Sequence, residues 1–127
     1  MKDNHKTVGQ FNKVFSRILS ADFPPLPIYK SDGLKKHIEK RHPHCIPYLD
    51  NIEEIIGAPD YIGMRDANSV ELIKIYNDNI LLALQIDKSN DHFYVASLYD
   101  ISDAKLNNRI HSGRLKPVNF TLFEEKT

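Results

Sequence analysis

The chain has 127 residues, of which 41% are hydrophobic and 27% are charged, and its 17 basic and 17 acidic side chains leave no formal net charge. This length predicts a single domain over residues 1–127 with a core over about 8–123, and the composition excludes an intrinsically disordered chain. Because the global charge is zero, any argument for nucleic-acid binding has to come from local clusters of charge.

The first half of the sequence predicts helices. The first helix is indicated by apolar residues at helical spacing, namely Phe11, Val14, Phe15, Ile18 and Leu19. The proline-rich stretch over 23–27 then predicts an extended connector, although its PxxP pattern is also typical of a partner-binding segment. A second helix is expected over Leu34–Arg41, with Ser31 or Asp32 as its cap, and a third from Pro47 to Gly57.

The second half of the sequence changes to strand patterns. Three segments rich in branched and aromatic residues are separated by short turns: Ser69–Tyr76, Ile80–Asp87 and His92–Tyr99. A last helix, capped by Ser102 and ended by Gly113, follows them, and Val118–Phe123 is a further edge-strand candidate. We therefore expect an α+β fold in which N-terminal helices pack on an antiparallel β-meander of three to four strands, followed by a C-terminal helix.

The cellular setting is predicted from cysteine usage and hydropathy. Cys45 is the only cysteine, so no intramolecular disulfide forms, as is typical of a reducing compartment. The first ten residues are polar and unlike a signal peptide, and the longest apolar run, Ile80–Leu84, is too short for a membrane span. We expect a cytoplasmic protein that is not bound to membrane.

Two segments are locally basic. Lys30–His44 carries five Lys or Arg, two acidic residues and three histidines, and Ser102–Lys116 carries four Lys or Arg with one Asp and one His. If both segments border one groove, they form a positive strip that attracts phosphate. The alternative is that they are two separate helix surfaces in contact with water.

The second predicted helix is the main candidate for carrying chemistry. At about 100° per residue, Leu34 and Ile38 point inward together, and His37 and Arg41 then lie at one edge of the buried side, with His42 at the other. This position suits an imidazole that takes part in a site completed by a sheet. The alternative is that His37 is an ordinary boundary residue and that Arg41 only covers the edge of the core.

Metal and cofactor sites are not expected. His42, His44 and Cys45 are potential ligands, but zinc sites usually take two separated pairs of ligands and no second cysteine is available. The sequence also lacks a phosphate-binding glycine loop, a nucleophile elbow and an HExxH motif.

Several of these segments, taken in order, resemble one nuclease family. The segments are GLKKHIEKRH, IEEIIGAPDYIG, SVELIKIY, ILLALQID and FYVASLYDIS, with a last helix that leads to SGRLK. Over roughly residues 8 to 117 they are similar to the phage-associated branch of the barnase–EndoU–colicin–RelE (BECR) superfamily. The resemblance implies a metal-independent RNase whose active groups lie on an exposed sheet face and on the helix beside it.

The resemblance also implies roles for particular residues. The catalytic candidates are His37, Ser97 and Tyr99, and the candidates for binding phosphate or RNA are Arg41, His42, Tyr61, Lys74 and Arg114. The partner is then RNA, such as tRNA or mRNA, and an active enzyme of this kind requires a neutralising inhibitor protein in its producer. The alternative is an inactive module of the same fold that binds RNA or a partner protein.

Overall fold

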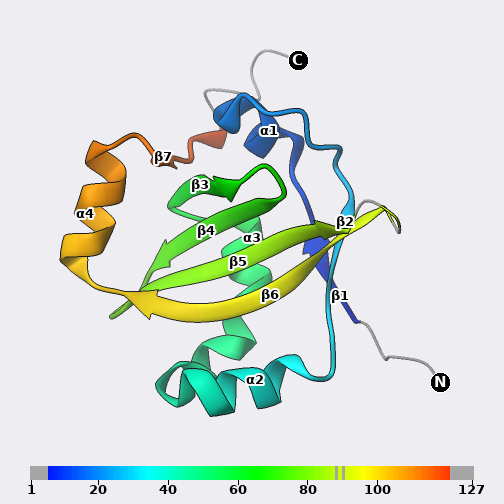
Figure 1. Ribbon diagram of the computed structural model, residues 1–127, viewed down its shortest axis with the longest axis vertical. Coiled ribbons are helices and arrows are strands. Elements are labelled where there is room, and N and C mark those ends of the chain that lie inside the picture. Colours follow the sequence, from blue (N-terminus) through cyan, green and yellow to red (C-terminus); the bar gives the residue numbers. More distant parts are fainter. Residues whose placement is uncertain (1–5, 88, 90, 121–127) are drawn as a thin grey trace.

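The computed structural model describes residues 6–87, 89 and 91–120, which form a twisted sheet with helices on both of its faces and beside one edge (Figure 1). The elements in chain order are β1 (Lys6–Gln10), α1 (Lys13–Leu19), β2 (Pro27–Lys30), α2 (Leu34–Arg41), the 3₁₀ helix η1 (Pro43–Asn51), α3 (Ile52–Gly57), β3 (Tyr61–Asp66), β4 (Ser69–Ile75), β5 (Asn79–Asp87), β6 (His92–Ile101), α4 (Asp103–His111) and β7 (Leu115–Pro117). Within these described residues, no helix is long and apolar enough to cross a membrane.

The sheet is larger than predicted. The described strands lie in the order β1-β2-β6-β5-β4-β3-β7, and all neighbours are antiparallel except β2 and β6. The predicted antiparallel meander is present as β4, β5 and β6. The expectation of only three to four strands, with all the N-terminal helices before them, is wrong, because β1 and β2 alternate with the first helices and β3 and β7 extend the other edge.

The predicted edge strand at Val118–Phe123 is a second correction. The last described strand is β7, which ends at Pro117, and Val118 and Asn119 are not in a strand. Residues 121–123 lie outside the described part of the chain. The pairing of β7 depends on its long-range contact with β3, which no local pattern in the sequence indicates.

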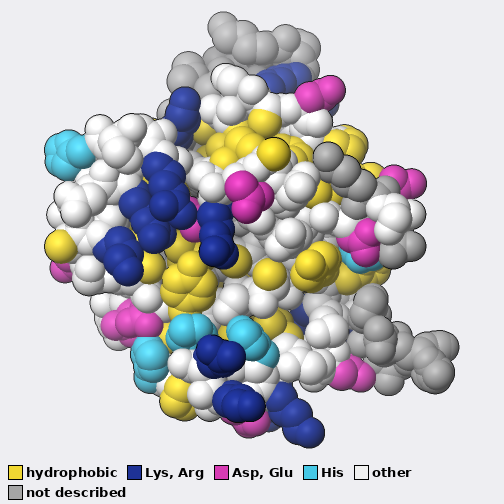
Figure 2. All heavy atoms as spheres, in the orientation of Figure 1, with side chains coloured by type: hydrophobic (Ala, Val, Ile, Leu, Met, Phe, Trp, Pro, Cys, Tyr) yellow, Lys and Arg dark blue, Asp and Glu magenta, His cyan; other side chains and the backbone are white. Residues whose placement is uncertain are grey.

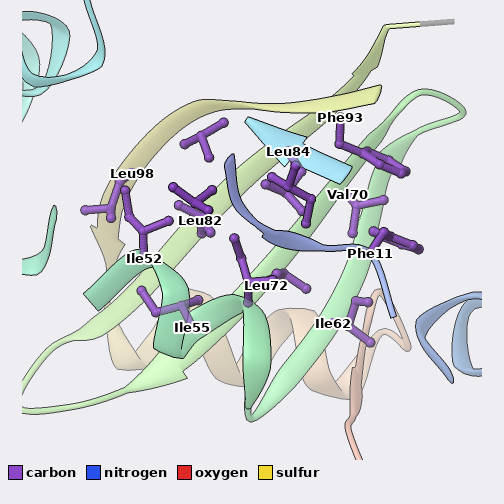
Figure 3. Close-up of a cluster of buried hydrophobic side chains, with 14 of the residues drawn as sticks. Phe11, Ile52, Ile55, Ile62, Val70, Leu72, Leu82, Leu84, Phe93 and Leu98 are labelled. Carbon is purple, nitrogen blue, oxygen red and sulfur yellow. The ribbon is translucent and has the colours of Figure 1, made fainter. Parts of the chain in front are cut away.

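One face of the sheet packs on the main hydrophobic core. Strand residues of this face alternate along β4, β5 and β6 and meet the buried sides of α1, α2 and α3. Figure 3 shows Ile52 and Ile55 of α3 beside Leu72 and Leu82 of the sheet, with Phe11 near Phe93 at the other end. We call this the core face. The regular alternation of apolar residues therefore decides which strand side chains remain for the opposite face.

The opposite face, which we call the open face, carries a smaller hydrophobic cluster. Its buried members are Ile73, Leu81, Ile101, Leu106 and Leu115, and α4 packs on it through Leu106. Because α4 covers only one side of this face, side chains on β5 and β6 remain partly exposed beside it.

The predicted limits of the helices agree with the structure better than the predicted capping residues do. α2 spans Leu34–Arg41 as predicted, but Gly33 occupies its N-cap position and no side chain caps it, so that neither Ser31 nor Asp32 has the predicted role. Pro47 lies inside η1 instead of starting a helix, since Pro43 already begins that 3₁₀ turn. Ser102 caps α4 as predicted, and its side chain accepts a hydrogen bond from the backbone N–H of Lys105.

Gly63 allows β7 to join the sheet. A Cβ atom built on Gly63 would lie 2.3 Å from the carbonyl oxygen of Arg114. We expect Gly63→Ala to lower the free energy of unfolding by about 1–3 kcal/mol in urea unfolding, because backbone has to move to relieve the overlap. Gly57→Ala is the control, since a Cβ atom there meets no atom within 4 Å. Equal losses in the two variants would contradict this explanation.

Candidate active site on the open face

The position of His37 follows from the way α2 docks. Leu34 and Ile38 lie one turn apart and are both buried, so they fix the side of α2 that faces the core. α2 packs beside the edge of β6, and His37, the residue before Ile38, remains exposed on that side. The helix ends at Arg41, and the backbone N–H of His42 bonds to the carbonyl of Ile38 at 2.7 Å. His37 and His42 are therefore both positioned by the last turns and the C-terminal end of one short helix.

A β-bulge in β6 sets the side chains that face these histidines. Ala83 of β5 pairs with Ser97, whereas the next residue, Leu84, pairs with Val95, so Ala96 is the extra residue. The bulge lets both Val95 and Leu98 join the main core. Ser97 and Tyr99 consequently share the open face, as the predicted period of two requires.

The predicted imidazole and hydroxyl groups meet at this point. The Nε2 atom of His37 lies 3.2 Å from the Oγ atom of Ser97, within hydrogen-bond distance. The ring of His42 stacks on Tyr99, with 5.2 Å between the ring centroids and 28° between the planes. Partial burial of the His42 ring, followed by the nearby charges of His37 and His44, lowers its pKa below the usual value for histidine. Two imidazoles and two hydroxyls thus lie together at one edge of the open face.

A buried ion pair lies on the same face. Glu71 of β4 is only 2% exposed, and its carboxylate accepts hydrogen bonds from Nε of Arg114 at 3.2 Å and from Nη2 at 2.7 Å. Arg109 of α4 brings a second guanidinium to the same carboxylate, with Nη1 at 3.9 Å from Oε2. Because a buried carboxylate needs such partners, Glu71 ties β4 to the C-terminal segment.

Strand register relates the ion pair to the histidines. Glu71 pairs with Ala83, and Ala83 pairs with Ser97, so the three residues form one row across the sheet. Two strand spacings of ~4.8 Å place Glu71 about 10 Å from Ser97 along this row. In Figure 2, histidines gather over α2 and β6, Lys and Arg gather beside α4, and hydrophobic side chains lie between the two groups.

Comparison with protein-family models matches residues 6–108 to the family described as phage-Barnase-EndoU-ColicinE5/D-RelE like nuclease3. The match covers most of the 127 residues. The chain belongs to this family. The resemblance noted in the sequence is thereby confirmed, and the protein is a phage-associated BECR-like nuclease by family. Searches of curated proteins and of solved structures gave no significant match.

Two of the predicted RNA contacts of this BECR-like chain lie away from the histidine group. Lys74 pairs with Ile80, a core-face residue, and its Nζ atom donates to the carbonyl oxygen of Ala58 at 2.7 Å after α3. It therefore belongs to the opposite face from Ser97. Tyr61 is on the open face, but it lies three strands away from Tyr99. There Tyr61 packs against the smaller hydrophobic cluster of that face. Arg41 is exposed at the end of α2, and its charge contributes to the lowered pKa of His42.

In the part of the BECR-like chain that the structure describes, His44, Cys45 and Asp100 each offer one potential metal-ligand atom within 4.8 Å of the others. Within this group, the Nε2 atom of His44 and Oδ1 of Asp100 lie 2.6 Å apart in a hydrogen bond. Burial, together with the neighbouring Asp100, raises the pKa of the Cys45 thiol to about 11.

Sequence reasoning missed three residues of this region: Glu71, Asp100 and Arg109. A signal existed for Glu71, because an acidic residue within an apolar strand requires a cationic partner. Arg109 belonged to a basic segment that was noted only for its charge. Asp100 follows Tyr99 without any local pattern, and its hydrogen bond with His44 spans 56 positions of the chain.

Proposed function

We propose that this BECR-like nuclease is an endoribonuclease that cleaves RNA without a metal ion and leaves a 2′,3′-cyclic phosphate. The observation that carries the proposal is the approach of His37 to Ser97 at 3.2 Å on the open face. An imidazole, a common general acid or base, is thereby placed beside a hydroxyl at the edge of a sheet, in reach of solvent. Membership of a nuclease family supports the general activity.

RNA provides its own nucleophile, which reduces the chemistry that the protein has to supply. A base takes the proton of the 2′-OH group, the oxygen attacks the adjacent phosphorus, and the bond to the 5′ oxygen breaks as an acid protonates that oxygen. In our proposal His37 is the acid or the base. The hydroxyls of Ser97 and Tyr99 orient the phosphate, or Tyr99 donates the second proton.

Cationic and aromatic groups supply the remaining requirements. The phosphorane carries more negative charge than the phosphodiester, so cations at its oxygens favour cleavage. Arg41 and His42, on the side of α2, are the proposed contacts of the phosphorane, and Arg114, on the side of α4, is a proposed contact of the RNA backbone. Arginine suits this role because its planar guanidinium donates two parallel hydrogen bonds. Tyr61 offers an aromatic surface for an unpaired base further along the sheet.

The direct test is incubation of the purified protein with single-stranded RNA in the presence of a chelator. We expect cleavage to persist and the products to end in a cyclic phosphate, detected by mass spectrometry. The same sequence as DNA is expected to remain intact, because it lacks the 2′-OH nucleophile. Loss of RNA cleavage on chelation would contradict the mechanism, and RNA binding without any cleavage would favour an inactive binding module.

A further inference from the structure

The two arginines beside Glu71 carry more positive charge than their partner neutralises. One carboxylate faces two guanidinium groups, and Arg114 uses only Nε and Nη2 in its pair with Glu71. The Nη1 atom of Arg109 is buried and has no hydrogen-bond partner among the described residues. Arg109 is 18% exposed and Arg114 is 35% exposed, so part of each side chain is in reach of solvent. A net positive charge in so restricted a setting favours an anion.

The sheet between the arginines and the histidines carries a small side chain. In the row that joins Glu71, Ala83 and Ser97, Ala83 lies between the other two residues, and its methyl group rises little above the strands. A chain of nucleotides laid along this row would therefore meet the arginines at one end and His37 at the other.

The distance between Glu71 and Ser97 indicates whether the arginines and His37 bind the same phosphate or two different ones. About 10 Å between Glu71 and Ser97, from two strand spacings of ~4.8 Å, exceeds what one phosphate group bridges with hydrogen bonds of about 2.7–2.9 Å. We propose that Arg109 and Arg114, held by Glu71, form a second phosphate subsite that binds a backbone phosphate next to the one that is cut. This inference rests on the proposed function and narrows its substrate to single-stranded RNA that extends beyond the cleaved linkage.

The choice of single strands follows from the same geometry. A single strand can lie flat across strands β4 to β6 and expose each phosphate in turn, whereas an RNA duplex presents its phosphates along grooves of fixed width. Hydrophobic side chains lie on the open face between the arginines and the histidines, which suits unpaired bases (Figure 2).

The test measures binding without cleavage. The probe is a labelled single-stranded RNA in which every 2′-OH is methylated, and its Kd is determined by fluorescence anisotropy over a range of KCl concentrations. We expect Arg109→Gln to weaken binding about tenfold at low salt and to reduce the slope of log Kd against log salt by about 0.7, the value for one lost phosphate on a single strand. Arg109→Gln is expected to fold, because Arg114 still pairs with Glu71.

Lys13→Gln is the matched control, since it removes one positive charge from an exposed position of α1, which packs on the core face. Arg109→Lys is a second variant. It is expected to keep the slope of log Kd against log salt but to bind RNA more weakly, because lysine lacks the planar guanidinium that donates two parallel hydrogen bonds. If Arg109→Gln has the same slope and affinity as Lys13→Gln, the subsite is refuted even when the enzyme cleaves RNA. If the wild type shows the expected binding but does not cleave unmethylated RNA, the subsite stands and the proposed function fails.

Discussion

His37→Ala is expected to slow RNA cleavage by about 10²- to 10⁴-fold, the usual contribution of a positioned acid or base. The imidazole of His37 lies 3.2 Å from a strand hydroxyl on the open face, where the proposed mechanism needs an acid or a base. Because His37 is exposed and the packing of α2 rests on Leu34 and Ile38, the variant should keep the fold. The measurement is the initial rate of cleavage of a single-stranded RNA by the two purified proteins.

His111→Ala is the control for this prediction. His111 is an exposed residue at the end of α4, and its loss should leave the rate within about twofold of the wild type, as for a surface change worth less than 0.5 kcal/mol. Expression in bacteria gives an independent readout, in which the wild type should impair growth and degrade RNA while His37→Ala does neither. Equal rates for His37→Ala and the wild type would remove His37 from the mechanism.

Glu71→Ala is expected to lower the free energy of unfolding by about 3 kcal/mol, the lower end of the range for breaking a buried ion pair. The carboxylate is almost fully buried, and its removal leaves Arg109 and Arg114 facing each other without a counter-charge. The lower end applies because Arg114 is 35% exposed, so water compensates part of the loss. Urea unfolding followed by circular dichroism measures the change.

Glu39→Ala provides the comparison, since it removes an acidic side chain from the exposed side of α2. Its free energy of unfolding should stay within about 0.5 kcal/mol of the wild type. A similar small change in Glu71→Ala would mean that the ion pair does not hold the C-terminal segment to the sheet. The m-values of the variants have to agree with the wild type for the comparison to apply.

Local patterns predicted the elements that depend on their own residues. The limits of α2, the three central strands and the Ser102 cap follow from apolar spacing and capping chemistry within short windows. Strands β1, β2, β3 and β7 were missed because their pairing depends on distant partners. Gly63 is an example. A side chain is excluded at this position because the carbonyl of Arg114 lies beside it, and that contact cannot be predicted from the residues around Gly63.

The candidate site could be predicted in part for the same reason. The helical wheel of α2 placed His37 at the edge of the buried side, and the period of two along β6 placed Ser97 and Tyr99 on one strand face, whereas only the family resemblance implied that they meet, as they do. Applying the same period to β4 would have grouped Lys74 with Leu72 on the core face, where the structure places it. The pairing of Glu71 with Arg114 spans 43 positions, and no local rule selects one arginine of a basic segment over another.

The distance between His37 and Ser97 along the chain has a consequence for synthesis on the ribosome. The two side chains meet in space but are 60 positions apart, so that β3, β4, β5 and the first part of β6 are synthesised between them. A nascent chain that has exposed α2 alone therefore carries the imidazole without its counterpart. Under the proposed mechanism, the ribosome and the message being translated are spared until the late strands have emerged and folded.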